Sequence, residues 1–91
     1  MKYNRVTSNR FRKDIRRLAK RGYDFSAMRV VIDKLANDEP LELKYHDHNL
    51  QGQFAGFREC HIDPDWILIY RKEDNNLVLL LLRTGTHSDI F

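Results

Sequence analysis

The chain is poor in residues that cross-link or interrupt a fold: its 91 residues include one cysteine, two prolines and four glycines. With Cys60 alone, no disulfide can form within the chain, which favours a reducing compartment. The longest apolar run, LVLLLL at residues 77–82, is far short of the roughly 20 residues that cross a bilayer. The start, MKYNRVTSNRFRK, lacks the apolar stretch of a secretion signal. We therefore expect a single domain over residues 1–91, located in the cytoplasm and without membrane contact.

Signatures of several enzyme classes are also missing. The chain contains no GxSxG motif, no Gly-rich phosphate loop or Walker pattern, and no CxxC or HExxH motif. These absences argue against serine hydrolases with a nucleophile elbow, P-loop nucleotide hydrolases and the common zinc enzymes. Any chemistry must come from other side chains.

Acidic residues are scarce in the first part of the chain. Residues 1–37 hold eleven Lys and Arg against three Asp, a balance of +8, whereas residues 38–91 hold five against ten, a balance of −5. Such asymmetry favours a polyanionic partner for the first part, either nucleic acid or an acidic protein. The alternative is a basic helix that is merely solvated.

The first part predicts a short strand and two helices. Residues 2–7 alternate weakly, as in a strand, and Ser8 can cap the helix that follows. Apolar residues then recur at helical spacing until Gly22, where a helix would stop. A second apolar stripe begins after Asp24 and ends before Pro40. Two helices with so short a connection form an antiparallel hairpin.

The remaining residues predict strands after a long ordered loop over residues 38–54. Residues 57–62 alternate between apolar and polar side chains, and residues 66–71 begin with the continuous apolar run WILIY of a strand buried on both faces. Residues 77–83 form another buried strand. Because short turns join these three strands, they should form an antiparallel meander. The expected fold class is α+β: an N-terminal strand, a helical hairpin, and a small twisted sheet with the helices on one face.

Titratable side chains gather at one edge of the expected meander. His61 ends one strand, Asp65 starts the next, and Arg83 and His87 leave the third, so all four should meet at one rim of the sheet. His48 lies in the long loop and reaches them only if that loop folds over the sheet face. The unperturbed pKa of histidine, about 6.5, suits it to proton transfer near neutral pH. Scattered surface histidines are the alternative explanation.

A zinc site is the competing interpretation of the same residues. His46 and His48, together with Cys60 and His61, are residue types that bind zinc. However, Cys60 and His61 are adjacent in a strand and point to opposite faces, so both cannot readily reach one ion. Alternation also places Cys60 on the apolar side, as a small buried residue rather than a thiolate nucleophile. We therefore expect no metal.

Two stretches resemble a known family. The segment YHDHNLQGQFAGFRECHIDPDWILIYR and the terminal LLRTGTHSDIF resemble the RelE superfamily of toxins from bacterial type II toxin–antitoxin pairs, in particular its YafQ branch. The resemblance is strong over residues 43–91, whereas residues 1–37 match only in pattern. Two positions depart from it: Glu59 stands in place of an aspartate, which leaves the role of residue 59 open, and His46 stands in place of a lysine.

The resemblance implies a ribosome-dependent endoribonuclease that cleaves mRNA in the ribosomal A site without metal or other cofactor. The catalytic residues that it implies are His48, His61, Asp65, Arg83, His87 and Phe91.

The resemblance also gives the basic hairpin a role. Its cations could grip ribosomal RNA, with an affinity that falls steeply with salt, or meet acidic segments of an antitoxin. These cations are Arg10, Arg12, Lys13, Arg16, Arg17, Lys20 and Arg21. The implied partners are a cognate antitoxin, the ribosome with its mRNA, and operator DNA only through the antitoxin complex. Two rivals stay open: a non-catalytic module of the same fold that binds nucleic acid or antitoxin, and a nuclease that cleaves free RNA.

Overall fold

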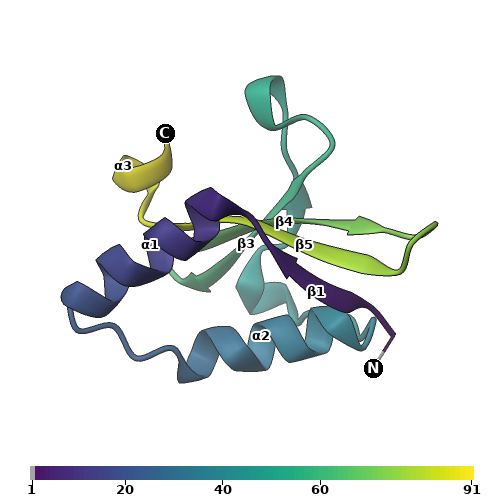
Figure 1. Cartoon of the computed structure of the whole chain (residues 1–91), viewed down its shortest axis with the longest axis horizontal. Coiled ribbons are helices and arrows are strands. Elements are labelled where there is room, and N and C mark those ends of the chain that lie inside the picture. Colours follow the sequence, from purple (N-terminus) through teal and green to yellow (C-terminus); the bar gives the residue numbers. More distant parts are fainter. Residues whose placement is uncertain (1) are drawn as a thin grey trace.

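The computed structural model describes residues 2–91 and shows a five-stranded mixed sheet packed with helices (Figure 1). The strand order across the sheet is β1-β5-β4-β3-β2. The elements along the chain are β1 (Asn4–Thr7), α1 (Asn9–Lys20), α2 (Ser26–Ala36), η1 (Leu43–Tyr45), β2 (His48–Asn49), η2 (Gly52–Phe54), β3 (Arg58–Asp63), β4 (Trp66–Glu73), β5 (Val78–Gly85) and α3 (His87–Ile90).

The predicted meander is confirmed, and the sheet extends further on both sides. β3, β4 and β5 pair antiparallel in sequence order. On one side β1 pairs parallel to β5, from Asn4 opposite Val78 to Thr7 opposite Leu81. On the other side the two-residue strand β2 pairs antiparallel to β3, with His48 opposite Glu59. The sheet therefore has two strands more than the predicted three-strand meander. One is the predicted N-terminal strand, and the other, β2, was not predicted because a two-residue strand has no periodicity that a sequence pattern can reveal.

The residues that we predicted to be one long loop, 38–54, hold the short elements η1, β2 and η2. The C-terminal residues also form the short helix α3, which the sequence analysis left without a secondary structure. Both corrections concern elements of two to four residues.

One face of the sheet packs against both long helices. Leu18 of α1 and Val31 of α2 are fully buried together with Cys60, Leu68 and Leu79 of the sheet. The opposite face also carries buried residues of the WILIY run, as predicted for a strand covered on both faces. These residues are Ile67 and Ile69, both with 0% exposure.

α1 covers an open edge of the sheet. β1 ends opposite Leu81, so beyond this point β5 has no strand neighbour on that side. Ser8 caps α1 as predicted: its Oγ accepts a hydrogen bond from Phe11 N at 2.9 Å, and the hydroxyl donates to the Leu82 carbonyl at 2.6 Å. Further on, Thr84 N donates to the Asp14 carboxylate at 3.1 Å. Side chains of α1 thus take the place of the missing strand.

Within residues 2–91, no helix has both the length and the apolar character needed to cross a membrane.

Candidate active site

β3 carries the centre of the site on the face opposite the helices. Cys60 and Ile62 point into the core, so alternation directs Glu59 and His61 to the other face. Glu59 is buried, with a side chain only 5% exposed, and its Oε2 lies 3.4 Å from His61 Nε2. The other ring nitrogen of His61, Nδ1, lies 3.3 Å from the carbonyl oxygen of Pro64. Both neighbours of the ring are hydrogen-bond acceptors.

β2 brings His48 to the same carboxylate. His48 Nε2 lies 3.3 Å from Glu59 Oε2, and its Nδ1 lies 2.6 Å from the carbonyl oxygen of His46. This ring also faces an acceptor at each nitrogen. The 38–54 segment thus brings His48 to the site by pairing β2 at the edge of the sheet, where His48 is directly opposite Glu59, rather than by folding over the sheet face.

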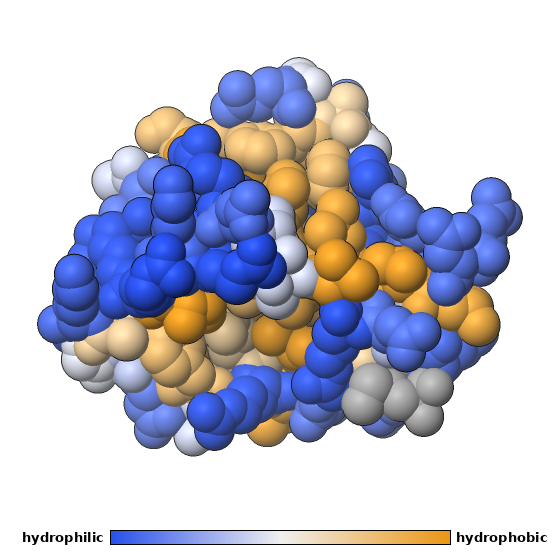
Figure 2. Space-filling view, in the orientation of Figure 1, coloured by the Kyte–Doolittle hydropathy of each residue, from blue (hydrophilic) through white to orange (hydrophobic). Residues whose placement is uncertain are grey.

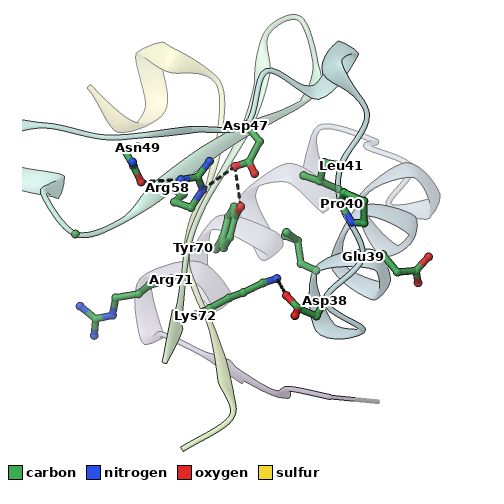
Figure 3. A pocket seen from close by; sticks show the side chains of 12 residues that line it. Asp38, Glu39, Pro40, Leu41, Asp47, Asn49, Arg58, Tyr70, Arg71 and Lys72 are labelled. Atoms are coloured by element: carbon green, nitrogen blue, oxygen red, sulfur yellow. Dashed lines mark hydrogen bonds and ion pairs between the residues drawn. The ribbon is translucent and has the colours of Figure 1, made fainter. Parts of the chain in front are cut away.

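The residues on either side of His48 are anchored in a polar cluster beside a cavity of about 460 Å³ (Figure 3). Asp47 accepts hydrogen bonds from Tyr70 Oη at 2.7 Å and from Arg58 Nε at 3.2 Å. Asn49 accepts from Arg58 Nη1 at 2.7 Å. Burial and the bond to Asp47 both raise the pKa of Tyr70, so its hydroxyl stays a donor. These bonds fix the short strand that presents His48.

α3 places His87 and Phe91 beside His61. The rings of His61 and His87 have centroids 5.8 Å apart, and His87 stacks on Phe91 with centroids 5.7 Å apart. Phe91 also meets Phe54 edge-on at 5.5 Å, so the terminal aromatic ring is held although it is 57% exposed. The His87 ring is exposed and forms no hydrogen bond to a residue in the described part of the chain.

Arg83 lies in β5 opposite Ile69, which places it on the same side of the sheet as Glu59. Its guanidinium is nearly buried and turns toward α1, where Nε and Nη2 donate to Asp14 at 2.8 and 3.2 Å. No residue among 2–91 binds the remaining Nη1. Arg83 thus has one nitrogen free and two bound in a buried ion pair with Asp14, and no contact joins its side chain to a histidine within residues 2–91.

Asp65 is the predicted site residue that the structure leaves apart. It is exposed in the turn between β3 and β4, and no hydrogen bond or ion pair joins its carboxylate to any of residues 2–91. The carboxylate that contacts imidazoles is Glu59. The signal for Glu59 was present in the sequence, because strand alternation puts Glu59 and His61 on one face.

A cavity of about 900 Å³ opens beside the histidines, lined in part by His46, His48, His61 and Pro64. Its volume lies within the range typical of ligand sites, about 300–1,000 Å³. The rings of His46 and His61 stand edge-on with centroids 5.7 Å apart, and the rings of His48 and His87 also neighbour His61, although His87 does not line this cavity.

Of the residues considered for zinc, Cys60 lies apart from the three histidines. Cys60 is fully buried in the core, and burial raises the pKa of its thiol, so it stays protonated. Across residues 2–91, no three His, Cys, Asp or Glu side chains are arranged to hold a metal ion.

The seven cations of the basic helix fall into two groups. Arg17 and Arg21 reach Asp89 of α3, and Arg12 bonds to Thr7 and Asn9 at the start of its own helix. The other four are exposed and have no partner within the described part of the chain: Arg10, Lys13, Arg16 and Lys20. In the orientation of Figure 1, hydrophilic side chains cover α1 as one continuous patch (Figure 2).

Comparison with known proteins gives consistent matches over almost the whole chain. Residues 3–91 match the family described as bacterial toxin of type II toxin–antitoxin system, YafQ. The mRNA interferase toxin YafQ of Escherichia coli K12 is 40% identical over 85 residues, which cover 92% of this chain and 90% of that protein.

Two solved structures have nearly the same fold. A metal-bound toxin from Helicobacter pylori superposes with a TM-score of 0.92 at 40% identity, covering 98% of this chain and 99% of that one. YafQ in the E. coli DinJ–YafQ complex superposes with a TM-score of 0.88 at 38% identity, covering 98% of each chain. The chain therefore belongs to the YafQ family of toxins of bacterial type II toxin–antitoxin systems.

Proposed function

We propose that this chain is an endoribonuclease that cleaves mRNA in the ribosomal A site by metal-independent acid–base chemistry. The observation that carries the proposal is that His48 and His61 both contact the buried Glu59, while the ring of His87, from a third element, lies beside that of His61. A relative with 40% identity is an mRNA interferase, which gives the same activity class.

The chemistry follows from the residue types. The ribose 2′-oxygen attacks the adjacent phosphorus, and the bond from phosphorus to the 5′-oxygen breaks. One base removes the 2′-hydroxyl proton, and one acid gives a proton to the departing 5′-oxygen. The products are a 2′,3′-cyclic phosphate and a 5′-hydroxyl. We assign these two proton transfers jointly to His61 and His87, whose rings are neighbours.

The other site residues stabilise or position the RNA. His48 and the free Nη1 of Arg83 supply positive charge to the phosphorane, a contribution that is often large in a pre-arranged site. Phe91 stacks on a base, as aromatic side chains do with single-stranded RNA. Glu59 orients His48 and His61. Asp65 is exposed at the β3–β4 turn, apart from the histidines, and we assign it no step of the reaction.

The partners follow from the charge and from the relatives. The exposed cations of α1 bind ribosomal RNA, which places the histidines over the A-site codon. A cognate antitoxin neutralises the toxin, as the solved complex of YafQ with the antitoxin DinJ suggests by analogy. Operator DNA is bound only by the toxin–antitoxin complex.

Product analysis tests the proposed chemistry. Cleavage of mRNA on programmed ribosomes should leave a 2′,3′-cyclic phosphate, or the 3′-phosphate formed from it, and a 5′-hydroxyl. The rate should be unchanged when the toxin is first treated with a chelator and then returned to the magnesium buffer that the ribosomes need. Other ends would reject the mechanism, and loss of activity after this treatment would favour a metal enzyme. Equal cleavage of naked RNA would identify a free nuclease, and growth arrest with intact mRNA would identify a non-catalytic binding module.

Reversing two exposed charges on α1 should weaken ribosome binding. In the variant Lys13→Glu/Arg16→Glu, two repulsive groups replace two phosphate contacts, so affinity for ribosomes should fall more than tenfold at low salt and become less salt-dependent. Neither side chain has a partner within residues 2–91, so the free energy of unfolding should change by less than about 1 kcal/mol. Ribosome co-sedimentation over a salt series measures the effect.

The variant Arg29→Glu/Lys34→Glu on α2 is a matched control with the same change in net charge. Its Lys34 loses only a surface ion pair to Glu42 at 3.3 Å. Equal loss of affinity in both variants would show that net charge, rather than the surface of α1, attracts the ribosome.

A further inference from the structure

α3 is too short to be stable on its own, although the position of His87 and of Phe91, the residue that follows it, depends on this helix. A four-residue helix is far below the length at which isolated helices are stable in water. Within the segment, Thr86 Oγ1 accepts a bond from Asp89 N, and the Asp89 carboxylate accepts from Thr86 N at 3.0 Å. This capping box satisfies the helix start but does not fix the helix relative to the sheet.

The Asp89 side chain also joins α3 to α1. Arg21 donates to both of its oxygens, from Nη1 to Oδ2 at 2.9 Å and from Nη2 to Oδ1 at 3.0 Å. Arg17 Nη2 lies 3.8 Å from the same Oδ2. The Asp89 side chain is only 12% exposed, and the bond from Arg21 holds its pKa well below the usual value, so it is charged at neutral pH. Two hydrogen bonds between one guanidinium and one carboxylate restrict both rotation and translation of the Asp89 side chain relative to Arg21.

The backbone just before α3, at Gly85, leaves room for the contact between Asp89 and Arg17. Gly85 has φ of +151°, and a Cβ there would lie 2.9 Å from Asp89 Oδ2 and 3.2 Å from Arg17 Nη2. A side chain at this position would therefore crowd the contact between Asp89 and Arg17, in a backbone conformation that favours glycine. Arg17 continues the chain of contacts, because its Nη2 also donates to Asp14 at 2.8 Å, and Asp14 binds Arg83.

We propose that Asp89 is a positioning residue that, through Arg21 and Arg17, locks His87 and Phe91 in place against His61. This inference rests on the proposed function, since His87 must take part in the reaction for its position to matter. Arg21, which the sequence analysis grouped with the RNA-binding cations, is then an anchor of the active site. The network also connects His87 with Arg83, so the imidazole and the guanidinium are held by one set of charges on α1.

The substitution Asp89→Asn tests the proposal because it removes the charge and keeps the shape. The rate constant for cleavage at saturating ribosome concentration should fall by about 10²-fold, since misplacement by about 1 Å can cost that much. The half-saturating ribosome concentration should stay unchanged. Arg21→Gln should have the same effect, and the double variant should be no slower than either single one. In NMR spectra of the free protein, the cross-peaks between the His61 and His87 rings should disappear.

Asp24→Asn is the matched control. Asp24 is exposed and accepts hydrogen bonds from Ser26 at the start of α2, and within residues 2–91 it is bonded neither to α3 nor to a histidine. Its loss should leave the cleavage rate and the ring cross-peaks intact. If the cleavage rate of Asp89→Asn matched that of the wild type, or if only its ribosome affinity fell, the proposal would be overturned. Should Asp89→Asn fail to fold, Arg21→Gln decides alone, because the Arg21 side chain is 42% exposed.

Cleavage rates and ring cross-peaks together distinguish a failure of the proposed nuclease function from a failure of the positioning role of Asp89. If neither the wild type nor His87→Gln cleaved mRNA, the nuclease assignment would fall, whereas loss of the ring cross-peaks in Asp89→Asn would still show that Asp89 positions α3. Persistence of the cross-peaks with a wild-type rate would overturn the positioning role while leaving the nuclease assignment intact.

Discussion

His87→Gln should lower the rate of mRNA cleavage on programmed ribosomes by about 10²–10⁴-fold, the typical contribution of one positioned acid or base. Glutamine keeps a polar side chain but cannot exchange a proton near neutral pH. Because His87 is exposed and has no hydrogen-bond partner within residues 2–91, its loss should change the free energy of unfolding by less than about 1 kcal/mol. Single-turnover cleavage and urea unfolding measure the two quantities.

His61→Gln should have an effect of the same order, and the two variants together distinguish acid from base. An mRNA whose scissile 5′-oxygen is replaced by sulfur needs no acid, because a thiolate leaves without protonation. This substrate should restore cleavage in the variant that lacks the acid and leave the other variant slow. Restoration in neither variant would mean that the departing oxygen is protonated by another group. A wild-type rate in both variants would remove the histidines from the mechanism.

The main strands and the long helices could be predicted from the sequence because the patterns that indicate them are local. The runs WILIY and LVLLLL, the turn at Asp63-Pro64 and the amphipathic pattern after Ser8 lie within short windows. The meander in turn explains why His61 and the residues after β5 come together, since adjacent antiparallel strands bring their connected ends to one rim.

The missing features depend on contacts between distant residues. β2 exists only because residues 48–49 find β3, and β1 joins β5 in a parallel pair that no local pattern encodes. The carboxylate that contacts imidazoles is Glu59 rather than Asp65, since strand pairing decides which carboxylate His48 and His61 meet. Arg21 looked like a free surface cation because its partner Asp89 is far along the chain.

The buried position of Asp14 could have been predicted from its helical spacing. Asp14 lies among the seven Lys and Arg of the basic helix, and its only use in the sequence prediction was in the charge balance of residues 1–37. Its spacing tells more: Phe11, Asp14 and Leu18 are three and four residues apart, on the face that α1 buries. An acidic residue on the buried face of a helix implies a buried cation as its partner. In this chain the partner is Arg83, 69 positions later.

Asp14→Ala should therefore be the most destabilising of these substitutions. Asp14 is 1% exposed, and its loss leaves the nearly buried Arg83 without a counter-ion and the Thr84 N–H without an acceptor. Breaking a buried ion pair costs about 3–5 kcal/mol, a large share of the 5–15 kcal/mol typical of a small domain. Urea unfolding should show the loss, whereas Asp33→Ala on α2, which breaks only an exposed pair with Arg5, should cost less than about 1 kcal/mol.

The double variant Asp14→Leu/Arg83→Met separates folding from chemistry. Replacing both members of a buried ion pair by apolar residues is often neutral for stability, so the variant should recover much of the free energy lost in Asp14→Ala. Its cleavage rate should stay low, because the guanidinium assigned to the phosphorane is absent. Recovery of both stability and cleavage would show that Arg83 serves the fold alone, and unchanged stability in Asp14→Ala would mean that the buried pair contributes little to folding.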